Sequence, residues 1–177
     1  MKSTGKVRVA MLSLGDAQYP QDYLNHLIAG LREEVGRMDL ELVACHTIMR
    51  DEDVQKVQNE LNGKKIDLFI INFVAWHITP YIMKILKNYR DVPLLVWGIG
   101  GKVDKTGKLQ SPAAVAGITA FIPVIKELGF KYEIICEKPD EPHRYADVEK
   151  FVRLVAAAKK ISNSRIGLIG YADMGLY

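Results

Sequence analysis

The sequence predicts an α/β domain: a doubly wound parallel sheet of about six strands with helices on both faces. Short runs rich in valine, isoleucine and leucine alternate along the 177 residues with longer amphipathic stretches, which is the order of alternating strands and helices. The short runs are apolar at successive positions, as in parallel strands that helices cover on both sides. No linker-like composition divides the chain, so we expect one domain over residues 1–177.

Six runs are expected to form the strands. Each is short and apolar, and a charged or turn-forming stretch separates it from the next amphipathic segment. In chain order the runs are Val7 to Leu14, Leu40 to Cys45, Ile66 to Phe73, Pro93 to Gly98, Tyr132 to Cys136 and Arg165 to Gly170.

Helical periodicity fills the intervals between these runs. Thr79 and Ser111 each precede a proline, which predicts an N-cap hydroxyl followed by proline at the first helical position. Acidic residues at the start of one stretch and Asn62-Gly63 at its end predict a capped helix between them. The helices are expected over Tyr23 to Val35, Val54 to Leu61, from Thr79-Pro80 onward, Ala113 to Leu128 and Tyr145 to Ile161.

Right-handed crossovers between such elements give a sheet of the flavodoxin or Rossmann type. Folds of this kind bind ligands outside the carboxyl ends of the strands, where the strand order reverses. A binding site is therefore expected among four segments: Gly15 to Tyr19, Val74 to Thr79, Gly98 to Gln110 and the tail after Gly170.

Composition argues against several classes of function. The net charge of +3 comes from 24 basic and 21 acidic residues that are spread along the chain, so we expect no nucleic-acid partner. Without an apolar run of about 18 residues or a cleavable leader, we expect no membrane partner and a cytoplasmic location. The chain has no GxGxxG, P-loop or GxSxG motif, and its histidines and two cysteines show no metal-ligand spacing.

The loop NFVAWHITPYIMKIL is the most informative of the four segments. Trp76 and His77 follow a buried strand and precede a helix, so both are expected to project from the carboxyl edge into a crevice. An indole ring stacks on the apolar face of a sugar, and an imidazole bonds to hydroxyl groups. The alternative is that Trp76 packs under a loop and His77 belongs to the start of the helix.

Two other loops leave their roles open. Asp16 ends the first strand, where it either contacts a ligand or caps the helix behind it. The basic, glycine-rich loop over residues 98–108 suits an anion, a neighbouring subunit or a surface hairpin equally well.

At these residues the chain resembles the N-terminal region of the L-fucose and L-arabinose isomerase family. WHITPYIMKILKNYRDVPLLVWG is similar to an arabinose isomerase segment in which a His-Thr-Phe-Ser-Pro loop opens a helix, and fucose isomerases carry a tryptophan just after this strand. SPAAVAGITAFIPVIKELGFKYEIICEKPDE resembles the helix, strand and helix that follow, and SRIGLIGYADMGLY resembles the glycine- and methionine-containing loop at the end of that region.

The resemblance implies an aldose–ketose isomerase that uses a divalent cation, typically Mn²⁺, whose ligands and general bases lie in later domains. In that family the N-terminal domain makes oligomer contacts and completes a neighbouring subunit's pocket. By position this implies sugar-binding roles for Trp76, His77 and Met174, and for Gln18 or Tyr19 in the first loop. The arginine that fucose isomerases carry in this loop is absent, which leaves the identity of the sugar open.

The sequence therefore supports the hypothesis of an N-terminal domain of a fucose/arabinose isomerase-like protein, cut from a longer chain. Such a domain is expected to bind sugar, to form a homo-oligomer and to be inactive alone, because it lacks ligands for the metal. A free-standing flavodoxin-like module that binds a sugar or nucleotide without catalysis is the first alternative. A purely architectural domain is the second.

Overall fold

The computed structural model describes residues 5–103, 105–165 and 167. Its centre is a parallel sheet in the order β2-β1-β3-β4-β7. The strands of this sheet are β1 (Val7–Leu14), β2 (Leu40–Ile48), β3 (Leu68–Phe73), β4 (Leu94–Gly98) and β7 (Tyr132–Cys136). The predicted strand over residues 165–170 lies outside the described residues, apart from Arg165 and Gly167.

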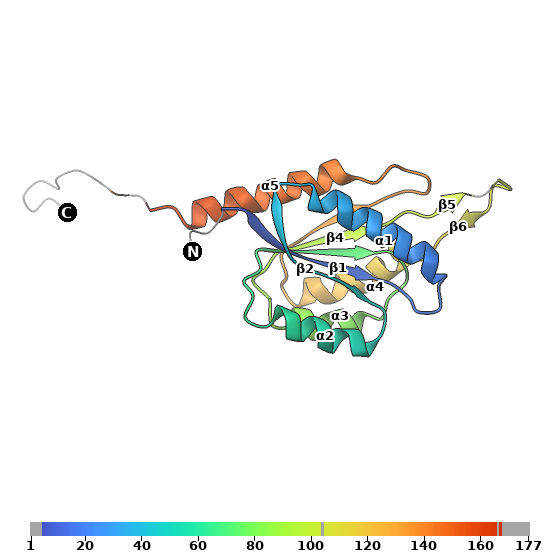
Figure 1. Ribbon diagram of the computed structural model, residues 1–177, viewed down its shortest axis with the longest axis horizontal. Helices are drawn as coiled ribbons and strands as arrows, with labels where there is room; N and C mark the ends of the chain where they lie inside the picture. Colours follow the sequence, from blue (N-terminus) through green and yellow to red (C-terminus); the bar gives the residue numbers. More distant parts are fainter. Residues whose placement is uncertain (1–4, 104, 166, 168–177) are drawn as a thin grey trace, which may run out of the picture.

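Helices cover both faces of the sheet (Figure 1). The helices are α1 (Gln21–Gly36), α2 (Asp51–Leu61), α3 (Thr79–Leu86), α4 (Ala114–Glu127) and α5 (Tyr145–Ser162). The buried residues of α1 and α5 pack with one face of the sheet, and those of α2, α3 and α4 pack with the other. The predicted doubly wound α/β class is confirmed, with the strand order of flavodoxin-like folds.

The central strands read as continuous apolar runs because both of their faces are covered. In β1 the residues Val9 and Met11 contribute to the core under α1 and α5, whereas Leu12 and Leu14 contribute to the core on the other side. This alternation is the two-residue period of a strand. Burial of apolar side chains on both faces supplies the main driving force that holds the layers together.

Two helix starts differ from the predicted caps. Thr79 is the first residue of α3 instead of its N-cap, which is Ile78, so Pro80 is the second helical residue and not, as predicted, the first. The helix α4 begins at Ala114, and Ala113 takes the N-cap position in a left-handed conformation. Ser111 lies two residues too early to cap α4; its hydroxyl accepts a hydrogen bond from the Ala113 N–H at 3.2 Å instead.

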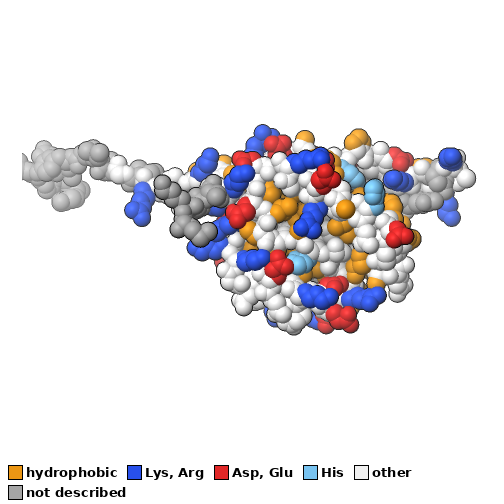
Figure 2. Space-filling model, viewed as in Figure 1, with side chains coloured by type: hydrophobic (Ala, Val, Ile, Leu, Met, Phe, Trp, Pro, Cys, Tyr) orange, Lys and Arg blue, Asp and Glu red, His pale blue; other side chains and the backbone are white. Residues whose placement is uncertain are grey.

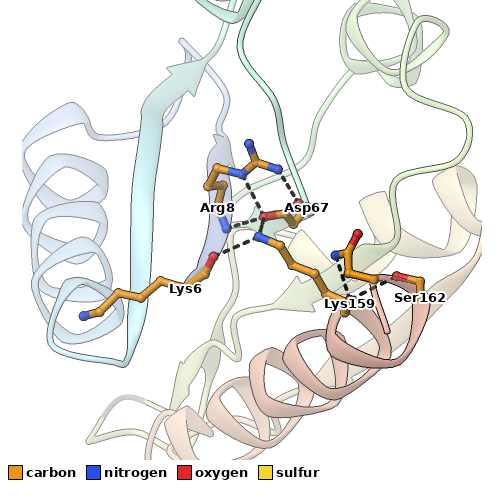
Figure 3. Close-up of polar contacts among 6 residues, drawn as sticks. Lys6, Arg8, Asp67, Lys159 and Ser162 are labelled. Atoms are coloured by element: carbon orange, nitrogen blue, oxygen red, sulfur yellow. Dashed lines mark hydrogen bonds and ion pairs between the residues drawn. The ribbon is translucent and has the colours of Figure 1, made fainter. Parts of the chain in front are cut away.

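An ion cluster closes the amino edge of the sheet between β1, β3 and α5 (Figure 3). Arg8 donates to Asp67 from its backbone N–H, Nε and Nη2, at 2.7–2.9 Å. Lys159 approaches the same carboxylate at 2.6 Å and also donates to the Lys6 carbonyl. Burial alone would raise the pKa of Asp67, but the hydrogen bonds from Arg8 and Lys159 outweigh it and hold this pKa well below its ordinary value.

The basic loop after β4 forms a short antiparallel ribbon of β5 (Lys102–Val103) and β6 (Leu109–Gln110). Figure 1 shows this ribbon protruding beyond the end of the sheet. The Asp140 carboxylate accepts a hydrogen bond from the Val103 N–H, which ties the ribbon to the loop that follows β7. Within the described chain, no helix combines the length and apolar character needed to cross a bilayer.

Candidate functional site

The strand order reverses between β1 and β3, so the chain leaves these two strands toward opposite faces of the sheet. The helix after β1 lies on one face and the helix after β3 lies on the other. This divergence opens the carboxyl edge of the sheet, where doubly wound folds bind their ligands. The loops after β1 and β3 contain most of the residues that the sequence predicts for the site.

The loop after β1 is built around Asp16. One of its carboxylate oxygens accepts a hydrogen bond from the Gln18 N–H at 2.8 Å, and its carbonyl accepts one from the Tyr19 N–H at 3.1 Å. This is an Asx-type turn, in which a side chain replaces a backbone acceptor. Gln18 is exposed, and the Tyr19 ring packs near Tyr23 of α1 at 6.1 Å between centroids. Asp16 thus shapes the loop, while a ligand contact by Asp16, Gln18 or Tyr19 stays a prediction.

His77 does not project into a crevice as expected. Its side chain is buried, with only 3 % of the residue exposed, and Nδ1 lies 3.0 Å from the Gly15 carbonyl. A carbonyl oxygen only accepts, so Nδ1 carries the proton. Burial lowers the pKa of His77 and keeps the ring neutral. His77 therefore joins the loops after β1 and β3 through this hydrogen bond, and its ring packs against Tyr81.

Trp76 lies beside His77 but remains 44 % exposed. Its backbone N–H donates to the Pro112 carbonyl at 2.7 Å, which fixes it near the start of α4. An exposed indole at this edge is available for stacking, so its predicted contact with a sugar remains open. Met174, the last predicted contact, lies outside the described residues.

A groove of about 500 Å³ lies at the carboxyl edge on the face covered by α1 and α5. Three segments form its walls: α1, the loop after β4 and the loop between β7 and α5. Figure 2 shows histidine side chains on this side of the molecule, some of them toward the end that carries the β5–β6 ribbon. The side chains that define the chemistry of the groove are Tyr23, His26, Lys102, Glu137, Asp140, Glu141, His143 and Tyr145.

Glu137 is the most buried of these side chains, with 4 % of the residue exposed. One oxygen accepts hydrogen bonds from Trp97 Nε1 at 2.8 Å and from the Arg144 N–H at 3.0 Å. The other oxygen lies 2.9 Å from His143 Nδ1. Burial alone would raise the pKa of Glu137, but these hydrogen bonds outweigh it and hold the pKa below its ordinary value. Glu137 is therefore ionised at neutral pH.

A cluster of aromatic rings lies next to the Glu137 carboxylate. The Trp97 indole is fully buried in β4 and meets the Tyr145 and His143 rings edge to face, at 5.6 and 6.3 Å between centroids. Tyr145 and His143 also contact each other edge to face. Edge-to-face contacts are the favoured geometry for aromatic pairs. The wall of the groove is consequently a rigid aromatic cluster with one buried charge.

A polar row continues from Trp97 across the sheet. Asn72 of β3 pairs in register with Trp97 on one side and with Ser13 of β1 on the other. The Ser13 hydroxyl lies 2.9 Å from Asn72 Oδ1, and both residues are buried. Buried polar side chains near the strand ends of a parallel sheet are uncommon. They set this end of the sheet apart from the apolar strand interiors.

Gly100 allows the walls of the groove to approach one another. A Cβ atom at this position would lie 2.2 Å from the carbonyl oxygen of Lys138. No side chain fits at that separation without a backbone shift. The loop after β4 and the loop after β7 can thus lie in contact only because the residue at position 100 is a glycine.

No group of three or more histidine, cysteine, aspartate or glutamate side chains in the described part of the chain is placed to hold a metal ion. One oxygen of the Glu137 carboxylate accepts two hydrogen bonds, and the other faces His143 Nδ1. The described residues therefore do not fit the Mn²⁺ ion that the isomerase resemblance implies, and its chemistry is not assigned to them.

Sequence reasoning missed the pair of Glu137 and His143. The signal was present in CEKPDEPHRY, where Glu137 comes directly after the end of a strand and a histidine follows six residues later. The contribution of Trp97 had no local signal, because its indole meets Glu137 only through the pairing of β4 with β7.

Comparisons with known proteins leave the family open. No family model matches the chain, and no curated protein matches it. One similar solved structure is an NADPH-quinone reductase from P. pentosaceus, with 13 % sequence identity, a TM-score of 0.36, and coverage of 91 % of this chain and 99 % of that chain. A similarity this distant carries no property of that protein over to this one.

Proposed function

We propose that this chain binds a small, neutral, polyhydroxylated ligand such as a sugar in the groove at the carboxyl edge of its sheet. The observation that carries the proposal is the wall built by Glu137, His143 and Tyr145, in which a buried carboxylate orients side chains on the groove. A volume of about 500 Å³ falls within the usual range for small-molecule sites.

The chemistry of the lining suits hydroxyl groups next to an apolar surface. Tyr23 and Tyr145 supply ring surfaces with a hydroxyl at the tip, and His26 and His143 supply ring nitrogens. Such side chains combine packing area with hydrogen bonding. A sugar ring, which has apolar C–H faces and an edge of hydroxyls, matches both properties.

The charge of the lining favours a neutral ligand over a phosphorylated one. Three carboxylate side chains, Glu137, Asp140 and Glu141, face the groove together with one lysine, Lys102. A phosphate group would be repelled by this excess of negative charge. Among the alternatives, a sugar is therefore favoured over a nucleotide or a flavin phosphate.

In the wider context we propose that the chain acts as the N-terminal domain of a fucose/arabinose isomerase-like protein. The support is the sequence resemblance of the loop at Trp76 and His77, together with a ligand groove at the edge where such a domain would contribute to a pocket. The domain would supply pocket and oligomer contacts, and the metal chemistry would belong to other domains. Sugar isomerisation by residues 1–177 alone in the presence of Mn²⁺ would contradict this assignment.

Calorimetric titration of the chain with L-fucose, L-arabinose and a sugar phosphate tests the proposed ligand. We expect weak binding of the neutral sugars and weaker binding of the phosphate. His26→Ala should lower the affinity, because His26 lines the groove. His46→Ala is the matched control, since His46 pairs with Glu60 of α2 on the other side of the sheet. Equal effects of the two substitutions, or no binding of any sugar, would refute the proposal.

A further inference from the structure

We propose that His143 selects the ligand by accepting a hydrogen bond through Nε2 from one of the ligand's hydroxyl groups. Glu137 is the positioning residue that leaves Nε2 free to accept this bond. The inference rests on the proposed function in that it concerns the same groove. It adds a requirement that the ligand present a free hydroxyl group at a defined point.

The protonation of the ring follows from its partner. His143 Nδ1 lies 2.9 Å from a Glu137 oxygen, and the low pKa of Glu137 makes that oxygen an acceptor only. The hydrogen of a neutral His143 ring must therefore reside on Nδ1. Nε2 is then left with a lone pair and no hydrogen, so it accepts hydrogen bonds and does not donate them.

The orientation of the ring is fixed as well as its tautomer. Glu137 cannot rotate away, because Trp97 Nε1 and the Arg144 N–H hold its other oxygen. Trp97 and Tyr145 meet the imidazole edge to face. At metal sites, a carboxylate that accepts a hydrogen bond from the ligating histidine orients its ring in the same way. The position of Nε2 is consequently set before a ligand arrives.

Nε2 is the nitrogen that faces the groove. The His143 side chain is 32 % exposed and lines the groove, whereas its Nδ1 is turned to a carboxylate that is almost fully buried. Within the described residues no hydrogen bond engages Nε2. An ether oxygen or a methyl group offers no hydrogen to this lone pair, so an O-methylated ligand is expected to bind less well than one with a free hydroxyl.

The first experiment measures the ¹⁵N signals of His143 in the free chain at a pH at which the ring is neutral. We expect the tautomer with hydrogen on Nδ1 and an unprotonated Nε2. Glu137→Gln should shift the tautomer equilibrium, because the glutamine amide can donate to Nδ1. The wild-type tautomer decides the point even where this variant fails to fold: a hydrogen on Nε2 would overturn the inference.

The second experiment adds ligands to the same sample. We expect L-fucose, and glycerol as a small triol probe, to shift the Nε2 signal. His143→Phe should weaken binding of L-fucose about tenfold, the loss of one hydrogen bond, whereas His46→Phe should not. L-fucose binding that leaves Nε2 and the His143→Phe affinity unchanged would overturn the inference but keep the proposed function. If glycerol shifts the Nε2 signal but no sugar binds, the proposed function is overturned and the inference about His143 is kept.

Discussion

Asp67 at the amino edge and Glu137 at the carboxyl edge are both shielded carboxylates, and hydrogen bonds hold the pKa of each below its ordinary value. Their partners differ. Asp67 is closed in by Arg8 and Lys159, which carry permanent charges at neutral pH and join three separate segments. Glu137 is paired with an imidazole at the wall of a groove. One arrangement locks the fold, and the other prepares a side chain for contact with a ligand.

The difference shows that a lowered pKa alone does not identify a functional carboxylate. The Asp67 cluster is complete, since all of its donors come from the chain itself. In the Glu137 cluster the contacts run from Trp97 through Glu137 to His143, and within the described residues no hydrogen bond engages the other ring nitrogen of His143 beside the groove. A candidate ligand site is therefore recognised by a polar atom that the described residues leave available for a ligand.

The largest effect is expected from Asp67→Asn. The substitution removes the charge that compensates Arg8 and Lys159, so we expect the free energy of unfolding to fall by about 3 kcal/mol. Urea denaturation measures this loss. Asp39→Asn is the matched control, because its ion pair with Lys6 is highly exposed and contributes at most about 1 kcal/mol. Equal losses in the two variants would mean that the amino edge is not a lock.

Acidification should reduce the Asp67 effect. The folded pKa of Asp67 is depressed, so its contribution to stability is complete above the unfolded aspartate pKa of about 3.9 and disappears as pH falls through that value toward the folded one. The stability gap between wild type and Asp67→Asn is therefore expected to narrow below about pH 4. Urea denaturation at pH 7 and pH 3 measures the gap, and a constant gap would contradict the assignment.

Gly100→Ala tests the packing of the carboxyl edge. The new Cβ would lie 2.2 Å from the Lys138 carbonyl oxygen, so the two loops must separate, at a cost of about 1–3 kcal/mol. We expect sugar affinity to fall with stability, because the groove wall moves. Gly36→Ala is the control, since its Cβ would make only an ordinary contact with Leu42 at 3.7 Å. Wild-type affinity in Gly100→Ala would show that the groove tolerates this displacement.

Trp76→Ala should have the smallest effect on stability, less than about 1 kcal/mol, because the indole is half exposed. Its effect on L-fucose affinity, measured by calorimetry, decides between the two roles that the sequence leaves open. A weaker affinity would extend the site from the groove to the loop after β3. Unchanged affinity would leave Trp76 as a surface residue and confine the site to the groove.

The strands could be predicted from sequence where burial is continuous. The run Val7 to Leu14 matches β1, because helices cover both faces of this central strand. The strand β2 extends beyond the predicted Cys45 to Ile48, since Thr47 and Ile48 pair with the end of β1. That pairing is set by a distant strand and leaves no signal in the local sequence.

The site was harder to predict because its geometry depends on contacts between separate loops. Sequence position placed His77 at the correct edge of the sheet, but its burial results from the Gly15 carbonyl, 62 residues away in the chain. Trp97 meets Glu137 across 40 residues. Local patterns identify which residues reach the edge, and the pairing of strands decides which of them meet.

The path of α5 has a practical consequence. This helix starts beside the groove and ends at the Asp67 cluster, and Figure 1 shows the start of β1 near that same end of the sheet. A helix of 18 residues spans about 27 Å. A fluorophore or a solid support attached to the end of α5 is thus joined to the protein far from the groove, which leaves the opening accessible to dissolved sugars in a binding assay.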